Sequence, residues 1–528
     1  MTNVVMPACS SRKRVLSSLF LLQSFILSIS SSVTSKFLWL SDIHLDPFYG
    51  QTKASTDMSQ TCSLASTNDS YPYGIFGCDA PLSLFQETLK HSSDLHHDLD
   101  FILFTGDLCR HSNDLFDDPI STTKSILSTV INMTHSMFPN VPIVAAIGNN
   151  DFTPDYYLDL EDQNHTNNML NMVTDAFASI FETSNEESQF RKGGYFARNI
   201  TDRLTILVLN TIMYSRSHLP AEQTYLEDPL GQFAWLQDQL QIVASSNRRV
   251  YIASHIPPAL GSFRKAQLWH DKYLETYYDI INSTLDDGIL AGQLFGHLHT
   301  DEFRFISHTN GYSYPLFISP SVTPVYGSNP SYRVVQYDDE TADLVDYETF
   351  YIDITNTTSI QEDPSWIEGT SFRESFGVSD MSKESLKEII SKLEEESARS
   401  NSTNAMHLWN AFLSRREVYS SRGGDDDSEI KRCLNDDKCR SEWLCVMTAL
   451  TRKEYETCLV KRVPTQDSVF FAGIIAATLV VVLLFLFCFA GKHRFASCLK
   501  RRMYQSNLQD VEINGELDIV DNSLPEVT

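Results

Sequence analysis

The sequence predicts a mixed α/β domain, and three observations support this class. From about Phe37 to Asp353, short apolar runs alternate with stretches of helical periodicity, a pattern typical of strands buried between helices. The apolar runs are too short for helices and are closed by glycine or polar residues, as buried strands are. Several runs also lead directly into Asp, His or Asn, which indicates a site at the ends of the strands.

Five apolar runs are each followed by a polar cluster. The pairs are Phe37–Leu40 with Ser41–His44, Phe101–Phe104 with Thr105–Asp107, Pro142–Ile147 with Gly148–Asp151, Val250–Ala253 with Ser254–His255, and Ile289–Phe295 with Gly296–His299. Ligands of open α/β sheets bind beyond the carboxyl ends of strands, so we expect these clusters to meet. Asp, His and Asn are suitable ligands for divalent metals. Each cluster alone occurs often by chance, whereas five in this order are specific.

Spacing within the clusters adds two expectations. Asp42 and His44 are two residues apart, as are His297 and His299, so strand geometry would place each pair on one face. Glycines are expected where the backbone turns sharply and approaches the ions. They are Gly106, Gly148 and Gly296.

The N-terminus is typical of a signal peptide. Basic residues Arg12–Arg14 precede an apolar stretch, Val15 to about Ile29, and the small residues Ser30–Ser35 suit cleavage. An uncleaved anchor is the alternative, but the stretch is short for a membrane span. We therefore expect residues 1–35 to be removed.

A second apolar run, Val469–Ala490, carries no charge and is long enough to cross a bilayer. Lys492–Arg494 and Lys500–Arg502 follow it and place that side in the cytoplasm. The sequence thus predicts a type I membrane protein with a cytoplasmic tail at 491–528 and a catalytic domain that is extracellular or in the lumen of a lysosome or vacuole. The sequons that predict N-glycosylation all precede the span: Asn68, Asn132, Asn164, Asn199, Asn282, Asn356 and Asn401.

The cysteines fit an oxidising compartment. The candidates for disulfides are Cys62, Cys78, Cys433, Cys439, Cys445 and Cys458. Cys109 is left over, either as a small buried residue or as a free thiol. The formal net charge is −27, which argues against nucleic acid as a backbone-binding partner.

Charged helical patterns replace the α/β alternation after about Pro364, and Lys383–Arg399 is typical of a surface helix. The predicted organisation is a signal peptide at 1–35, a catalytic domain at 36–360, a helical cysteine-containing segment at 361–465, a transmembrane helix at 469–490 and a tail at 491–528.

The five clusters resemble the motifs of the calcineurin-like metallophosphoesterases: Asp-X-His, Gly-Asp, Gly-Asn-His-Asp/Glu, His and Gly-His-X-His. Further segments are similar to the branch that holds acid sphingomyelinase, its phosphodiesterase relatives and the endopolyphosphatases. They are Tyr73–Asp79, Asp228–Trp235, Ser321–Pro324, Asn329–Pro330 and the cysteine cluster with Trp443 and Tyr455. The resemblance covers roughly residues 37 to 460. It implies a four-layer metallophosphoesterase β-sandwich flanked by helices, followed by the small disulfide-stapled helical segment.

The resemblance also implies a role for each residue. Asp42, His44 and His299 would bind one divalent ion, Asp107 would bridge two, and Asn149, His255 and His297 would bind the second, with zinc as the implied metal. A hydroxide between the ions would attack phosphorus, and His111 would protonate the leaving group. Two further residues are interpreted without the resemblance: Asp151 would orient a neighbour or cap a following turn, and Arg110 would meet substrate phosphate or form a surface ion pair.

One position departs from the superfamily motif. The residue after the metal-binding Asn is usually His, but here it is Asn150, which can hydrogen-bond phosphate and cannot act as an acid. Gly148–Asp151 and Arg110–Asp114 are similar to endopolyphosphatases, whereas the C-terminal cysteines, Ser321–Pro324 and Gly231–Trp235 are similar to sphingomyelinase-like phosphodiesterases.

The predicted function is therefore hydrolysis of phosphodiesters in nucleotides, phosphorylated small molecules or lipid headgroups. The alternatives are an endopolyphosphatase that cleaves polyphosphate and a catalytically silent membrane receptor or binding module on the same fold. The complete ligand set argues against the silent module. Sphingomyelin is a weaker expectation, because only a few residues separate the predicted signal from Asp42 and leave no room for a lipid-presenting domain.

Overall fold

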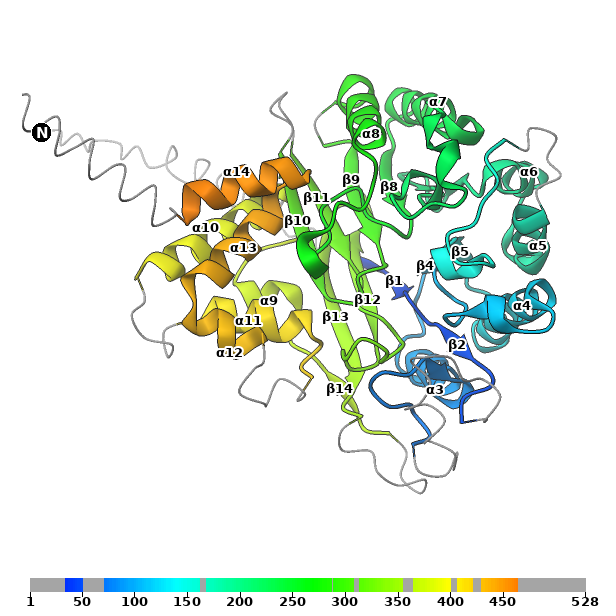
Figure 1. The fold of residues 1–528 in the computed structure, drawn as a ribbon, viewed down its shortest axis with the longest axis horizontal. Helices are drawn as coiled ribbons and strands as arrows, with labels where there is room; N and C mark the ends of the chain where they lie inside the picture. Colours follow the sequence, from blue (N-terminus) through cyan, green and yellow to red (C-terminus); the bar gives the residue numbers. More distant parts are fainter. Residues whose placement is uncertain are drawn as a thin grey trace, which may run out of the picture. The chain divides into compact units, whose positions relative to one another are not determined.

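The computed structural model describes residues 34–50, 71–161, 168–286, 288–307, 313–354, 364–399, 406–420 and 429–463. Within this part of the chain, two six-stranded mixed sheets are flanked by helices, in agreement with the predicted α/β class (Figure 1). The five apolar runs that preceded polar clusters all form strands.

The first sheet has the strand order β14-β13-β12-β1-β4-β5. The strands are β14 (Trp366–Glu368), β13 (Leu344–Ile352), β12 (Ser331–Asp338), β1 (Thr34–Leu40), β4 (Phe101–Thr105) and β5 (Ile143–Ala146). Strands β1, β4 and β5 are parallel, with Leu38 beside Ile102 and Ile102 beside Ile143. Their carboxyl ends therefore lie at one edge.

The second sheet has the order β10-β11-β9-β8-β7-β6. Its strands are β10 (Glu302–Ser307), β11 (Ser313–Ile318), β9 (Leu290–Phe295), β8 (Arg249–Ala253), β7 (Leu204–Val208) and β6 (Phe196–Asn199). Strands β7, β8, β9 and β11 are parallel. The sheets contact each other where the rings of Phe37 and Tyr251 lie 6.3 Å apart and Tyr251 donates to the carbonyl of Ala342 at 2.7 Å.

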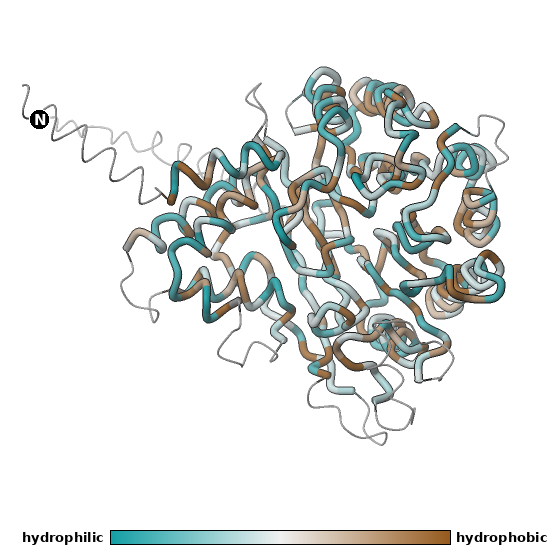
Figure 2. The backbone as a smooth tube through the Cα atoms, in the orientation of Figure 1, coloured by the Kyte–Doolittle hydropathy of each residue, from teal (hydrophilic) through white to brown (hydrophobic). Residues whose placement is uncertain are grey.

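The helices fall into two groups along the chain (Figure 1). The first group is α3 (Leu82–Leu95), α4 (Pro119–Met137), α5 (Asn168–Ala176), α6 (Ser184–Gly193), α7 (Gln232–Ser245) and α8 (Asp271–Thr284). The second is α9 (Phe372–Phe376), α10 (Lys383–Arg399), α11 (His407–Arg416), α12 (Glu429–Asn435), α13 (Asp437–Thr448) and α14 (Arg452–Arg462). Hydrophobic and hydrophilic residues alternate along these helices (Figure 2).

Helix α10 has the predicted bounds, and it buries one apolar face while it exposes a charged one. Leu386, Ile389 and Leu393 are fully buried at helical spacing, while Glu384, Glu388 and Glu395 carry the polar surface. The segment after residue 360 is not wholly helical, however, because β14 pairs with β13 and forms an edge of the first sheet. Its Trp366 stacks on His91 at 4.7 Å and packs on Tyr332, which explains why this short apolar stretch joins the sheet.

The cysteines of the C-terminal segment form two disulfides, Cys433–Cys439 and Cys445–Cys458. Cys78 is also disulfide-bonded, and Cys62 lies outside the described residues. Cys109 is the free, buried cysteine among those described. The disulfides indicate a protein of the secretory pathway.

Other predictions are met only partly by the described residues. No helix among them is long and apolar enough to cross a membrane, and the predicted span Val469–Ala490 lies outside them, as do the signal peptide and the tail. One compact unit extends to Leu459, so the catalytic domain and the helical segment pack together, and the boundary at 360 stays a prediction.

Three predicted glycosylation sites can be placed. Asn132 and Asn199 are exposed, whereas Asn282 is half-buried and accepts a hydrogen bond from Tyr314 at 2.7 Å. Asn68, Asn164, Asn356 and Asn401 lie outside the described residues.

Candidate active site

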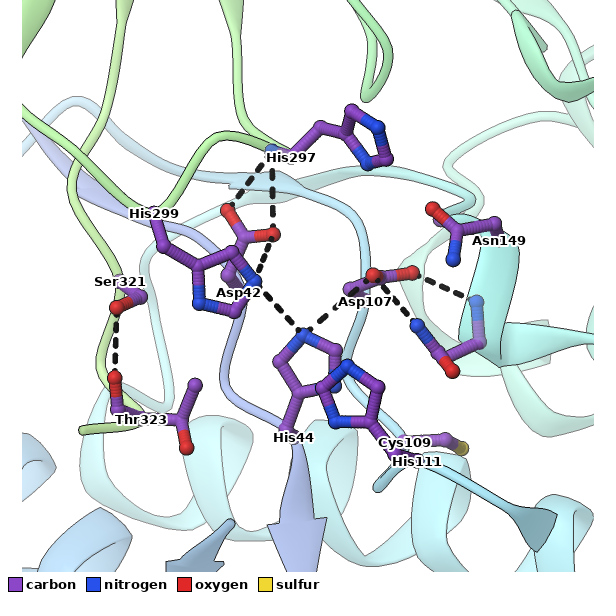
Figure 3. A network of polar contacts seen from close by, with 12 residues as sticks. Asp42, His44, Asp107, Cys109, His111, Asn149, His297, His299, Ser321 and Thr323 are labelled. Carbon is purple, nitrogen blue, oxygen red and sulfur yellow. Dashed lines mark hydrogen bonds and ion pairs between the residues drawn. The ribbon is translucent and has the colours of Figure 1, made fainter. Parts of the chain in front are cut away.

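The two sheets deliver their polar clusters to one place (Figure 3). Asp42 and His44 follow β1, Asp107 follows β4, and Asn149 follows β5. From the second sheet, His255 follows β8, and His297 and His299 follow β9. The predicted meeting of clusters at the carboxyl ends of parallel strands is therefore confirmed.

The clusters form two adjoining groups of potential metal ligands. Asp42, His44 and His299 make up the first, and Asp107, His255 and His297 the second. Asp107 lies between them, since its Oδ2 is 3.4 Å from His44 Nε2 and 3.2 Å from His255 Nε2. The Asn149 Oδ1 approaches His255 Nε2 to 3.0 Å on the side of the second group.

The spacing of two residues brings Asp42 and His44 together for a different reason from the one predicted. Both follow the strand in a loop and have positive φ angles of 49° and 44°. His297 and His299 likewise have φ of 71° and 58°. Non-glycine residues in the left-handed region carry strain that surrounding contacts must offset, and such strain is common at functional sites.

Two glycines allow the loops to approach closely. A Cβ atom on Gly148 would overlap the backbone of Asp107, and one on Gly296 would lie 2.7 Å from Asp42 Oδ2. Gly106 has a φ of 87°, which favours glycine directly. The three glycines thus have the predicted role, although only Gly106 needs its unusual φ.

Asn150 is held against the central carboxylate. Its backbone N–H donates to Asp107 Oδ1 at 2.8 Å, and its side-chain Nδ2 donates to Asp107 Oδ2 at 2.9 Å. The residue that replaces the usual His therefore orients Asp107. One amide hydrogen remains for a phosphate oxygen.

Asp151 fastens two loops together. Its buried carboxylate accepts hydrogen bonds from the backbone N–H groups of Gly148 at 2.7 Å, Asp107 at 3.0 Å, Leu108 at 2.8 Å and Cys109 at 3.0 Å. The side chain orients the neighbouring loop, as predicted, but the turn that it caps is the preceding one at Gly148 rather than a following one.

Replacing Asp151 with alanine is expected to lower the free energy of unfolding by at least about 3 kcal/mol, because four buried N–H groups lose the carboxyl oxygens that accept their hydrogen bonds. Urea denaturation followed by circular dichroism measures this loss. A variant of an exposed aspartate, Asp343→Asn, serves as the control, since it loses only a surface ion pair with Arg249. Equal stability of the two variants would contradict this role for Asp151.

His111 lies beside the first group. Its ring stacks on that of His44 at 4.1 Å (Figure 3). Its Nδ1 is 2.8 Å from Asp79 Oδ1. Asp79 also accepts the backbone N–H of His111 at 2.9 Å. The outer nitrogen, Nε2, is 3.1 Å from the hydroxyl of Tyr326, whose side chain is largely exposed.

The electrostatics separate His111 from His44, His297 and His299 but not from His255, because burial opposes protonation of His255 while the Asp107 carboxylate raises the pKa of His255 to about 9. Burial opposes its protonation, but the Asp79 carboxylate raises the pKa of His111 to about 9. Burial and the neighbouring imidazoles lower the pKa of His44 and of His297 to about 3, and they lower the pKa of His299 further. Neutral imidazoles bind metals, whereas a protonated one can donate a proton.

Arg110 contacts three neighbouring residues. Its guanidinium pairs with Asp46 at 3.1 Å, lies over the ring of Phe116 and donates from Nε to the carbonyl of His111 at 2.9 Å. The ion pair named as an alternative is present, but it is buried rather than on the surface.

The residues present fit a pair of divalent ions. In each group two imidazole nitrogens face each other at 3.2 Å: His44 Nε2 with His299 Nε2, and His255 Nε2 with His297 Nδ1. Nitrogens bound at about 2.0–2.1 Å to one tetrahedral ion lie about 3.4 Å apart. The other His255 nitrogen, Nδ1, is 2.8 Å from the Thr105 carbonyl, as is common for metal-binding histidines.

Sequence reasoning gave no role to Asp79, Asp155 or Tyr326. Asp155 accepts from Asn149 Nδ2 at 2.8 Å and thereby turns Asn149 Oδ1 toward the second group. Asp79 lay inside a segment used for the family resemblance, but nothing in its spacing pointed to His111. These three residues come from loops whose course no periodicity predicts.

Comparison with known proteins gives concordant findings. The model of the calcineurin-like phosphoesterase family matches residues 35–301, and that of the acid sphingomyelin phosphodiesterase C-terminal region matches residues 313–465. Acid sphingomyelinase-like phosphodiesterase 3b of Homo sapiens is 30% identical over 446 residues, which cover 80% of this chain and 90% of that protein. Cyclic GMP-AMP phosphodiesterase SMPDL3A of Homo sapiens is 28% identical over 368 residues, which cover 66% and 77%. Among solved structures, PhoD matches with a TM-score of 0.40 at 12% identity, over 69% of this chain and 77% of PhoD.

Proposed function

Because this chain belongs to the calcineurin-like phosphoesterases, and within them to the acid sphingomyelinase-like phosphodiesterases, we propose a role for each residue of its two-metal site. The chain is a metal-dependent phosphodiesterase. The observation that carries the assignment is the pair of ligand groups around Asp107 with the Asp79–His111 pair beside them.

We assign Asp42, His44 and His299 to one ion, Asn149, His255 and His297 to the other, and Asp107 to both. The imidazole-rich ligand set favours zinc. When bound, two such ions supply an activated hydroxide and neutralise charge on the phosphoryl oxygens. The chain itself holds Asp107 in place through Asn150 and points the Asn149 oxygen inward through Asp155.

His111 is the proposed acid for the leaving group. Asp79 fixes its Nδ1, so its Nε2 is the atom that can carry a proton toward a leaving oxygen. In the structure this nitrogen meets the Tyr326 hydroxyl, which a substrate oxygen would replace. Arg110 supports the same residue through the His111 carbonyl and is not assigned to substrate.

The proposed substrates are phosphodiesters of nucleotides. Tyr326 supports this class, because the residue is 61% exposed and its ring lies 4.6 Å from the ring of His299, where a base could stack on it. A relative at 28% identity is named for cyclic GMP-AMP. We further propose that the catalytic unit works outside the cell or in the lumen of a lysosome or vacuole. Residues Val469–Ala490 would anchor the protein in the membrane.

Polyphosphate is a second candidate substrate, and the presence of Asn150 where the family motif has His favours it. A side chain that binds phosphate without donating a proton suits a phosphoanhydride, because phosphate is a better leaving group than an alkoxide and needs less acid catalysis.

The test uses the full chain in detergent with a cyclic dinucleotide, sphingomyelin in mixed micelles and long-chain polyphosphate. We expect cleavage of the dinucleotide. Tyr326→Ala should raise KM for it about tenfold, because base stacking is lost, whereas Tyr326→Phe should keep KM near that of the wild type. If the enzyme shortens polyphosphate and leaves the cyclic dinucleotide intact, the nucleotide proposal is overturned and the protein is an endopolyphosphatase.

A further inference from the structure

The loop after β9 carries two proposed ligands in a strained conformation and therefore needs support on both sides. His297 and His299 both have positive φ angles. On the N-terminal side, the backbone N–H of His297 donates to Asp42 Oδ1 and Oδ2 at 3.1 and 3.0 Å. On the C-terminal side, the chain continues into Asp301 and Glu302, two buried acids with no part in the assigned chemistry.

Asp301 is held from three elements. Its Oδ1 pairs with Arg333 Nη2 at 2.8 Å and accepts from the Tyr347 hydroxyl at 2.6 Å, while its Oδ2 accepts from Arg415 Nη2 at 3.2 Å. Its backbone N–H donates to the carbonyl of Arg416 at 3.1 Å. The residue two positions after His299 is thus fixed by β12, β13 and α11.

Glu302 is fixed in the same way. Its Oε1 accepts from Thr300 at 2.7 Å and from Arg416 Nε at 3.1 Å, and its Oε2 accepts from Arg304 at 2.6 Å. Two consecutive acids after the loop are therefore paired with two consecutive arginines of α11.

These arginines are in turn fixed by the C-terminal segment. Arg415 Nη1 donates to the Thr370 carbonyl and to Ser375 Oγ, the latter at 2.9 Å. The Arg416 guanidinium lies 4.6 Å from the ring centroid of Trp443 in α13. Lys265, from the loop after His255, places its Nζ atom 4.4 Å from the centroid of the same Trp443 ring. The C-terminal segment thus contacts both loops of the second sheet that carry proposed ligands.

We infer that Arg415 and Arg416 are positioning residues for the metal site: they hold Asp301 and Glu302, and through them they keep His297 and His299 in their strained, ligand-competent conformation. The inference rests on the proposed ligand assignment. The C-terminal helical segment would thus support the loop that carries His297 and His299.

The test measures metal retention in the full chain. Wild type, Arg415→Gln, Asp301→Asn and Arg440→Gln are loaded with zinc, titrated with a chelator, desalted and analysed for bound metal. Arg440 is the matched control, because it is a buried arginine of the same segment that bonds only within it, to the carbonyls of Cys433 and Leu434 and to Asp437. Arg416→Gln is a milder variant for the case in which Arg415→Gln does not fold.

We expect Arg415→Gln and Asp301→Asn to release one or both ions at a chelator concentration at least tenfold lower than wild type. Arg440→Gln should behave as wild type, and the double variant of Asp301 and Arg415 should lose no more than either single one. Unchanged retention in folded Arg415→Gln and Arg416→Gln, or equal loss in Arg440→Gln, would overturn the inference. A wild-type chain that binds no pair of ions would instead refute the ligand assignment beneath it.

Discussion

Replacing Asp107 with asparagine is expected to lower kcat at least about 1,000-fold, which corresponds to about 4 kcal/mol of transition-state stabilisation. The carboxylate lies between His44 and His255 at 3.4 and 3.2 Å, so it is placed to serve both ligand groups. Burial opposes its ionisation, but His255 and His44 hold the pKa of Asp107 well below its usual range. An amide keeps the shape of this group and removes its charge.

The control for Asp107→Asn is Asp175→Asn, which removes an exposed partner of Lys124 and Arg191 and should leave kcat unchanged. Bound metal is measured on the same samples. A pure binding module would keep its function without Asp107. A folded Asp107→Asn enzyme with the turnover of the wild type would refute the claim that this carboxylate serves both ligand groups.

Replacing His111 with alanine is expected to lower kcat about 10²–10⁴-fold on a diester with an alkoxide leaving group, the range typical of general acid catalysis. The loss should be much smaller on a nitrophenyl diester, whose leaving group needs no proton. The comparison separates acid catalysis from support of the metal site, because damage to the neighbouring His44 would slow both substrates alike. Equal losses on the two substrates would contradict the assigned role.

Asp79→Asn gives a second test of the same residue. Because Asp79 raises the pKa of His111, its removal lowers that pKa. The acid must be protonated to act, so kcat falls as pH rises through the pKa, and the alkaline limb of the kcat profile should move to lower pH in the variant. A limb that stays in place would show that another group controls it.

The ligand-bearing loops could be predicted from sequence because each one begins where a strand ends. The run Phe37–Leu40 is fully buried in β1, and Asp42 follows two residues after its end, so the apolar pattern locates this proposed ligand without any three-dimensional information. The parallel pairing of β1 with β4, and of β8 with β9, then brings the loops together. For this reason the meeting of the polar clusters that contain the proposed ligands is the best predicted feature of the site.

The rest of the site depends on contacts between distant residues. Asp79 and His111 are 32 positions apart, and Asp301 and Arg415 are 114 apart, and no periodic pattern joins either pair. The positive φ angles of the ligands were also not predicted, because strand spacing gave the right pairs for the wrong reason. Likewise, the sequence marked Asn150 as unusual but did not predict that its amide would hold Asp107.

The most direct test of the account couples metal content to catalysis in the full chain. The protein is stripped with a chelator and zinc is returned stepwise while bound metal and hydrolysis of a phosphodiester are measured on the same samples. We expect two ions to bind per chain and activity to return only as the second ion binds. Full activity with fewer than two ions, or a chain that holds two ions and leaves every diester intact, would contradict this expectation.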